Sequence, residues 1–466
     1  MKKFFPLLLF LVFCTSAVHA RVVTGTVSSG KQKLSGVLVS DGTNFTKTNR
    51  SGKFTFSIED DAAFVYIITP SGYAGEWSSG VPAFYQPVQD KNEFAFDLVR
   101  LQQSDTYHII AVGDPQPRMP EQFEKFAGQP LDDMVSTAAS LKNMTVGIAL
   151  GDICFDRFDL MERWKPAIVK TGIPFYTAVG NHDHDREFTD DKNSIKKYRE
   201  MLGPENYALF LGKDIMIVLD NIIYDGGRSN YDEGYTDAVI DWVEKLMKYV
   251  PADADIYVAQ HSPLNGRLNR KMVVNYDKML KALEGHEVLF ISGHNHINGN
   301  FEYAENVREH NVSAICGTWW ETYYSKDGTP SGYKVYTKAD DHLTWYFKSL
   351  GHDKDYQFDV YLPGTCRLNP ESFVVNVWDY DPCWRVEWYE DGVYMGIMQQ
   401  VQEYCPAHEA ELKAIYEPQG KMPSEYKRTV TASHYFAERP GDGTQEIMVK
   451  VTDRFGNVMT EKVLLK

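Results

Sequence analysis

Five apolar segments of this chain each end in a cluster of polar side chains, and this repeated pattern restricts the fold more than any other feature. The clusters read GD at 113–114, GD at 151–152, GNHD at 180–183, QH at 260–261 and GHNH at 293–296. Each follows a run such as HIIAV or VLFIS, which is typical of a buried strand. Ligands of open α/β sheets bind beyond the carboxyl ends of the strands, so the five clusters are expected to converge on one site.

The spacing between these segments predicts an α/β core over residues 105–350. Stretches with helical periodicity alternate with the strands, as expected when each strand is followed by a helix that covers the sheet. The predicted helices span residues 121–142, 159–171, 194–202, 236–249 and 274–284. Glycines at the strand ends are expected to let the backbone turn tightly.

The regions on either side of this core have a different pattern, and with 466 residues the chain is too long for one ordinary domain. Residues 21–104 contain short runs rich in β-branched and aromatic residues, such as KFTFSI, separated by turn dipeptides. Residues 351–466 return to the same pattern, with SFVVNVW and QEIMVKVTD. Each region is therefore predicted to be a small all-β sandwich.

The first 20 residues predict export. MKK is followed by the apolar run FFPLLLFLVF, and Val18-His19-Ala20 forms an acceptable cleavage site before Arg21. Residues 1–20 are thus expected to be a signal peptide, and the mature protein to be periplasmic or secreted. The bulky Phe13 before Cys14 argues against lipoprotein anchoring, and no other run is long enough for a transmembrane segment. Export permits disulfides, and a bridge among Cys366, Cys383 and Cys405 is left open.

The charge of the chain bears on its partners. The formal net charge is −16, and removal of Lys2 and Lys3 makes it two units more negative. Nucleic-acid binding requires a basic face, so we expect no nucleic-acid partner and reject a nuclease reading of HNH at 294–296. An anionic substrate would need a local positive centre, which a bound metal ion supplies.

The order D-x-[HQ], GD, GNHD, H and GHxH resembles the calcineurin-like metallophosphoesterase superfamily over residues 105–350. The flanking regions resemble the N- and C-terminal modules of one secreted bacterial branch. The resemblance implies an α/β fold, with a central two-sheet αββα sandwich flanked by two small all-β sandwich domains. It also implies two metal ions between the two packed sheets.

The resemblance assigns a role to each residue of the motifs. Asp152 is implied to bridge both ions, with Asp114, Gln116 and His296 completing the first site. The second site is implied to be completed by Asn181, His261 and His294, with His182 facing the leaving group and Asp183 orienting His182. The residue types agree with this chemistry independently. Carboxylate, amide and imidazole suit divalent ions, and two such ions activate a water for attack on phosphorus.

Gln116 departs from the commoner pattern, which has histidine at this place. Glutamine occurs in a subset that includes manganese-dependent ADP-ribose and CDP-alcohol phosphatases. Residues two apart in a strand point the same way, so Asp114 and Gln116 are expected to reach one ion. An oxygen-rich ligand set favours manganese, with zinc, iron or magnesium as alternatives.

The sequence therefore predicts a secreted or periplasmic phosphoric ester hydrolase with two divalent metal ions. Its substrate is expected to be a phosphate monoester, a diester or a pyrophosphate, within a phosphorylated small molecule or an envelope component. The alternative is an inactive envelope- or glycan-binding protein that uses its β-sandwich modules. Arg118 and the aromatic GTWWETYY at 317–324 could contact substrate or only pack, and the sequence does not indicate an oligomeric state.

Overall fold

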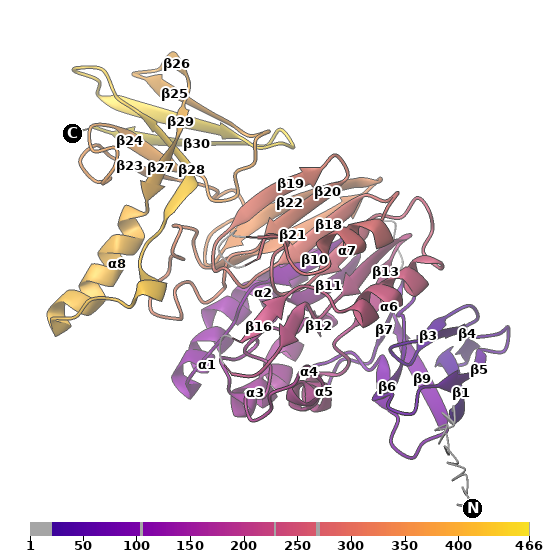
Figure 1. Ribbon diagram of the computed structural model, residues 1–466. Coiled ribbons are helices and arrows are strands. Elements are labelled where there is room, and N and C mark those ends of the chain that lie inside the picture. The colour runs from indigo at the N-terminus through magenta and orange to yellow at the C-terminus, as the bar shows by residue number, and fades with distance from the viewer. Residues whose placement is uncertain (1–20, 103–105, 228–229, 267–270, 466) are drawn as a thin grey trace, which may run out of the picture.

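The computed structural model describes residues 21–102, 106–227, 230–266 and 271–465. Three parts follow one another along the chain, with the N-terminal module at one end, the C-terminal module at the other and the central domain between them (Figure 1). The predicted signal peptide at residues 1–20 lies outside the described residues.

The N-terminal module consists of two small sheets. One has the order β2-β1-β9-β7, with β5 also paired to β1, and the other has the order β4-β3-β6-β8. Its strands are β1 (Arg21–Ser29), β2 (Gln32–Lys33), β3 (Leu38–Ser40), β4 (Phe45–Lys47), β5 (Lys53–Ile58), β6 (Phe64–Ile67), β7 (Tyr73–Gly75), β8 (Tyr85–Pro87) and β9 (Glu93–Arg100). Strict alternation in β9 buries Phe94, Phe96 and Leu98 and exposes the residues between them.

The central domain has two larger sheets, ordered β12-β11-β10-β21-β22 and β13-β14-β17-β18-β20-β19. The first sheet contains β10 (Tyr107–Val112), β11 (Met144–Ala149), β12 (Phe175–Thr177), β21 (Gly332–Ala339) and β22 (His342–Ser349). The second contains β13 (Tyr207–Leu211), β14 (Asp214–Val218), β17 (Ile256–Ala259), β18 (Val288–Ser292), β19 (Gly299–Ala304) and β20 (Val307–Asn311). A separate hairpin joins β15 (Ile222–Tyr224) to β16 (Tyr231–Glu233).

Helices cover the outer face of each sheet. Those of the central domain are α1 (Pro120–Ala127), α2 (Gln129–Ser140), α3 (Phe158–Ile168), α4 (Asp191–Ser194), α5 (Lys196–Leu202), α6 (Asp237–Met247) and α7 (Tyr276–Ala282). The apolar faces of α1, α2, α3 and α5 share a core with Ile110 and Val112 of β10. Ile109 and Ala111 belong instead to the core that includes the second sheet, α6 and α7. All of β10 is therefore buried, and the predicted αββα sandwich is confirmed.

The helices differ from their predicted limits where local chemistry interrupts them. The single helix expected over 121–142 is two helices that meet at Gly128, and Pro130 begins the second because its fixed φ suits a first turn. The helix expected over 159–171 ends at Ile168 and continues as a 3-10 turn, η1 (Val169–Thr171), before Gly172 in the left-handed conformation.

The C-terminal module is a second pair of sheets, ordered β23-β24-β28-β27 and β26-β25-β29-β30. Its elements are β23 (Asp359–Tyr361), β24 (Phe373–Asn376), β25 (Arg385–Glu390), β26 (Val393–Ile397), β27 (Gln399–Tyr404), α8 (Pro406–Tyr416), η3 (Glu417–Gln419), η4 (Glu425–Lys427), β28 (Thr431–Glu438), β29 (Glu446–Thr452) and β30 (Val458–Leu464). The cysteines of the described residues, Cys366, Cys383 and Cys405 among them, are free thiols, so the disulfide left open by the sequence is not formed there.

Candidate metal centre

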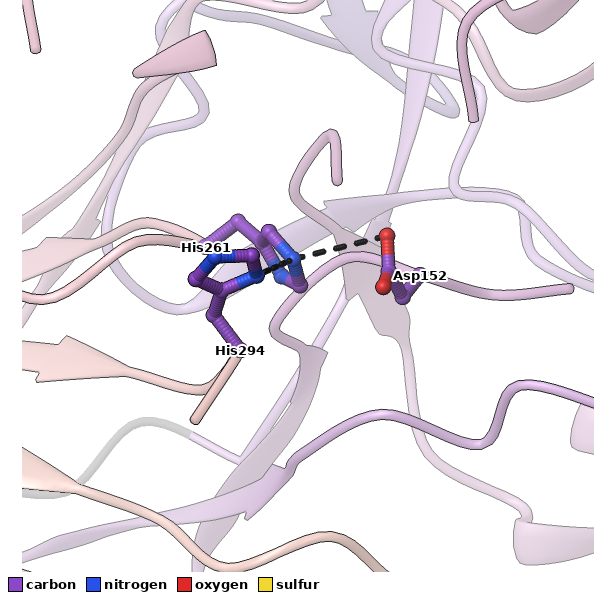
Figure 2. A group of neighbouring side chains, drawn as sticks. All are labelled: Asp152, His261 and His294. Atoms are coloured by element: carbon purple, nitrogen blue, oxygen red, sulfur yellow. Dashed lines mark hydrogen bonds and ion pairs between the residues drawn. The ribbon is translucent and has the colours of Figure 1, made fainter. Parts of the chain in front are cut away.

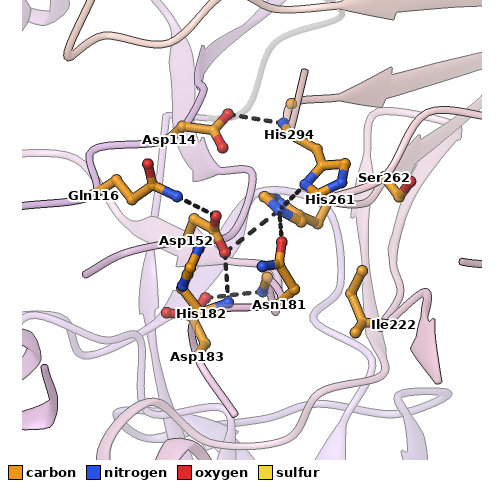
Figure 3. A network of polar contacts seen from close by, with 12 residues as sticks. Asp114, Gln116, Asp152, Asn181, His182, Asp183, Ile222, His261, Ser262 and His294 are labelled. Carbon is orange, nitrogen blue, oxygen red and sulfur yellow. Dashed lines mark hydrogen bonds and ion pairs between the residues drawn. The ribbon is translucent and has the colours of Figure 1, made fainter. Parts of the chain in front are cut away.

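The loops that follow β10, β11, β12, β17 and β18 converge between the two sheets and carry the predicted ligands (Figure 3). Asp114 and Gln116 lie beyond the end of β10 and have positive φ angles of 43° and 46°. Loop geometry therefore directs these two side chains in place of the expected strand alternation, and their binding to one ion stays a prediction. Asp152, His294 and His296 also have positive φ, a conformation that aspartate and histidine adopt more readily than most residues.

The glycines of the motifs are required by close approach rather than by turning. Gly180 and Gly293 do not have positive φ. A Cβ atom on Gly180 would lie 2.2 Å from the backbone nitrogen of Asp152, and one on Gly293 would lie 2.6 Å from Asp114 Oδ2. Any side chain at either position would displace a predicted ligand. Among the motif glycines, Gly151 does have a positive φ, of 86°.

Asp152, His261 and His294 lie together in one half of the centre (Figure 2), and Asn181 lies beside them (Figure 3). The Nε2 atom of His261 lies 3.4 Å from Asp152 Oδ1, 3.1 Å from Asn181 Oδ1 and 3.0 Å from His294 Nδ1. His261 Nδ1 is 2.7 Å from the carbonyl oxygen of Leu150. A carbonyl only accepts, so Nδ1 carries the proton and the Nε2 lone pair faces the other three side chains.

The same reasoning fixes the tautomer of His294. Its Nε2 atom lies 3.0 Å from Glu233 Oε1 on β16 and 3.4 Å from the hydroxyl of Tyr231. The carboxylate favours a proton on Nε2, which leaves the Nδ1 lone pair directed at His261. Two imidazole lone pairs, an amide oxygen and a carboxylate oxygen thus face one another, and such a group of acceptors needs a cation between them.

The other half of the centre contains Asp114, Gln116 and His296. Asp114 Oδ1 and Gln116 Oε1 are buried and accept no hydrogen bond from the described residues, and Asp114 Oδ1 lies 3.5 Å from Nε2 of His296. The remaining polar atoms are engaged, since Asp114 Oδ2 accepts from the backbone nitrogen of His294 and the Gln116 amide donates to Asp152 Oδ2. Buried polar atoms are normally paired. A divalent ion would pair these atoms, so the residues present fit a second metal.

The charges around His261 favour a cation. Burial alone would lower the pKa of this imidazole, but the carboxylates of Asp152 and Asp114 outweigh burial and raise the pKa to about 10. Burial likewise opposes ionisation of Asp152, yet His261 and His182 hold its pKa below the ordinary value. Nε2 of His261 therefore binds a proton when no metal ion is bound to it, and a divalent ion would replace this proton at the same lone pair. The carboxylates thus favour a positive charge at this position, which is the electrostatic condition for binding metal ions.

The structure contradicts the expectation that Asp183 orients His182. The Asp183 carboxylate accepts from the backbone nitrogens of Gly180 at 2.8 Å and Ile153 at 3.1 Å, so it ties two ligand-bearing loops together. The imidazole of His182 contacts Asp156 instead, with Nδ1 2.7 Å from Asp156 Oδ1. Asp156 also pairs with Arg186.

A cavity of about 350 Å³ opens onto the centre. It is lined by Gln116, Arg118, Asp152, Phe155, Asn181, His182, His294, His296, Trp319, Ser424, Tyr426 and Lys427. Arg118 and Trp319 thus face the cavity, with the Arg118 guanidinium 4.0 Å from the Phe155 ring centroid. The sequence reasoning missed Asp156, Glu233 and Tyr426, for which no local motif existed.

The comparisons with known proteins cover all three parts of the chain. Residues 107–298 match the family described as calcineurin-like phosphoesterase, residues 21–101 match its N-terminal module and residues 309–459 match its C-terminal module. No protein with a curated description matches.

Two solved structures illustrate how distant the similar folds are. A dimetal phosphatase from Danio rerio is 13% identical, with a TM-score of 0.37 over 52% of this chain and 96% of that chain. A 5'-nucleotidase from Candida albicans is 10% identical, with a TM-score of 0.34 over 53% of this chain and 52% of that chain. The assignment therefore comes from the three family matches, and this chain belongs to the calcineurin-like phosphoesterase family, in the branch with N- and C-terminal modules.

Proposed function

We propose that this protein hydrolyses a phosphate monoester, a phosphodiester or a pyrophosphate with two divalent metal ions bound at the candidate centre. The observation that supports this most directly is the convergence of carboxylate, amide and imidazole side chains with buried acceptor atoms that make no hydrogen bond. Asp114 Oδ1 and Gln116 Oε1 accept none from the described residues, Asp114 Oδ1 lies 3.5 Å from His296 Nε2, and His261 Nε2 lies 3.0 Å from His294 Nδ1.

In this proposal Asp152 serves both ions. Asp114, Gln116 and His296 hold the first ion, and Asn181, His261 and His294 hold the second. When bound, the two ions would lower the pKa of a water and offset the charge that develops on the phosphoryl oxygens. The Gln116 carbonyl makes the first site rich in oxygen ligands, which favours manganese over zinc or iron, with magnesium as a weaker alternative.

His182 is placed to exchange a proton with the leaving group. Its backbone nitrogen donates to Asp152 Oδ1 at 2.8 Å, and its ring stacks on Phe155 with centroids 3.8 Å apart. Asp156 and Arg186 both contact Nδ1, at 2.7 Å and 3.0 Å, so Nε2 is the nitrogen available to the substrate. Arg118, which lines the same cavity, is positioned to bind an oxygen of the phosphate.

We also propose that the protein is exported to the periplasm or secreted, where its substrate is a phosphorylated small molecule or an envelope component. The support is the signal-type sequence of residues 1–20. No helix among the described residues has the length and apolar character required to cross a bilayer. Mass determination of the mature protein should give an N-terminus at Arg21, and retention of Met1 would contradict export by this signal.

The test of the activity uses the purified protein before and after removal of metals. Hydrolysis of para-nitrophenyl phosphate, its diester and pyrophosphate would be measured with added manganese, zinc, iron or magnesium, together with metal content per chain. We expect activity that requires added metal, is highest with manganese and accompanies two bound ions. Asp152→Asn should bind fewer ions and lose orders of magnitude in rate. No turnover under any of these conditions would favour the alternative of an inactive binding protein.

A further inference from the structure

Three residues of the C-terminal module reach the catalytic cavity. Ser424, Tyr426 and Lys427 line it together with the residues of the metal centre, although they follow the last predicted ligand by more than a hundred positions. Tyr426 is 65% exposed, so most of its side chain is accessible from the cavity side or from solvent. Residues of both the central domain and the C-terminal module therefore line the cavity.

This segment is held in place by a network of polar contacts. Lys427 Nζ contacts the Glu321 carboxylate and donates to the hydroxyl of Tyr416 at 2.9 Å. The Tyr416 hydroxyl in turn donates to Glu321 Oε2 at 2.7 Å. In addition, the backbone nitrogen of Val430 donates to the carbonyl of Lys326 at 2.9 Å. These contacts attach the C-terminal segment to the loop that contains Trp319.

His408 on α8 connects the same two segments through its two ring nitrogens. The Thr318 hydroxyl donates to the carbonyl of Tyr324 at 3.1 Å, so it accepts from His408 Nε2 at 3.0 Å. His408 Nδ1 then accepts from the hydroxyl of Thr429 at 2.9 Å. Burial lowers the pKa of His408 to about 4, so the ring stays neutral at pH 7, as one donor and one acceptor require.

Trp319, the residue next to Thr318, forms an aromatic wall of the cavity. Its ring lies 4.7 Å from that of His296, and the Arg118 guanidinium is 5.5 Å from its centroid. Its φ of 50° is unusual for a bulky residue and persists only where surrounding contacts hold the backbone. Contacts from α8 help to hold the backbone of this loop, since the Glu411 carboxylate accepts from the backbone nitrogens of Tyr323 and Tyr324.

We propose that the C-terminal module is part of the active site and that Tyr426, with Trp319, selects substrates whose leaving group carries a flat ring. This inference rests on the proposed phosphoesterase activity and adds the class of leaving group. Two aromatic side chains line one cavity beside the metal centre, Trp319 from the loop between β20 and β21 and Tyr426 from the segment after α8. Aromatic faces bind rings better than they bind small alkyl groups.

The experiment compares esters that differ in the ring alone. Benzyl and methyl alcohols have similar acidity, so benzyl and methyl phosphate, and the corresponding methyl diesters, isolate ring recognition from leaving-group chemistry. Wild type should prefer the benzyl ester in kcat/KM. Tyr426→Ala should reduce this preference about threefold to tenfold, the range expected for one aromatic contact. The loss in kcat/KM on the methyl ester should be much smaller than the loss on the benzyl ester, and Tyr426→Phe should retain the preference.

A matched control is Tyr394→Ala, because Tyr394 is a 51% exposed tyrosine on β26 of the same module and does not line the cavity. An unchanged benzyl preference in Tyr426→Ala, or equal losses on both esters, would overturn the inference while leaving the proposed activity intact. Absence of hydrolysis of any ester by wild type with any metal would instead refute the activity, and the inference with it.

Discussion

Replacing Asp156 by asparagine should slow hydrolysis of alkyl phosphates about tenfold to a hundredfold. The Asp156 carboxylate lies 2.7 Å from His182 Nδ1, and the two side chains are only 16% and 11% exposed. A hydrogen bond to a charged group is worth about 1.5–3 kcal/mol, and about 1.4 kcal/mol corresponds to a factor of ten. Because asparagine still offers an oxygen acceptor but no charge, we expect the effect near the lower end of this range.

A comparison of substrates with poor and good leaving groups tests whether Asp156 acts through His182. If Asp156 acts through protonation of the leaving alcohol by His182, the loss should be large for methyl phosphate and small for para-nitrophenyl phosphate, whose leaving group needs no proton. Single-turnover rates on both esters, with metal content determined for each variant, measure this. Asp159→Asn is the control, since Asp159 pairs with Arg157 and its side chain is 62% exposed. Equal losses on the two esters, or loss of bound metal in Asp156→Asn, would refute a role through His182.

Three further changes test the metal centre and the core. Gln116→Ala should leave one of two ions weakly bound after dialysis, whereas Gln116→His should shift the preferred metal from manganese towards zinc or iron in metal-titrated activity. Glu233→Gln should weaken the second ion about tenfold to a hundredfold in a competition assay with a metal chelator, because Glu233 faces the distal nitrogen of His294. Burial raises the pKa of Glu309 from 4.5 to about 7, so the folded state binds this proton more tightly than the unfolded state. Relative to Glu309→Gln, wild type should therefore lose about 3 kcal/mol of stability in urea between pH 4.5 and pH 7.

Sequence reasoning located the loops of the centre because each motif directly follows an apolar strand. The sheet order places β10 beside β11 and β17 beside β18, and the packing of the two sheets brings these two pairs of strand ends together. The conformation of those loops was not accessible in the same way. The positive φ of Asp114 and Gln116 depends on backbones that pass against them from other strands, as the close approach of Gly293 to Asp114 shows.

The residues that were missed share one physical property, which is that their roles come from contacts between distant segments. Asp156 is 26 positions from His182, and Glu233 is 61 positions from His294. Neither residue lies in a local sequence motif that would indicate its role. Tyr426 belongs to another module, and the packing of α8 and of the segment after it against the loop around residues 318–326 brings it to the cavity.

The position of β21 in the sheet has a consequence for how the protein folds. Strand β10, which leads into Asp114, pairs on one side with β11 and on the other with β21, so that Ile109 lies opposite Tyr336. At usual rates of synthesis the roughly 220 intervening residues take about ten to forty seconds to make. Throughout that time one edge of a strand that is buried in the folded protein lacks its partner, and unpaired edges of this kind are prone to aggregate. Folding of the centre is therefore expected to be slow and to depend on chaperones during synthesis.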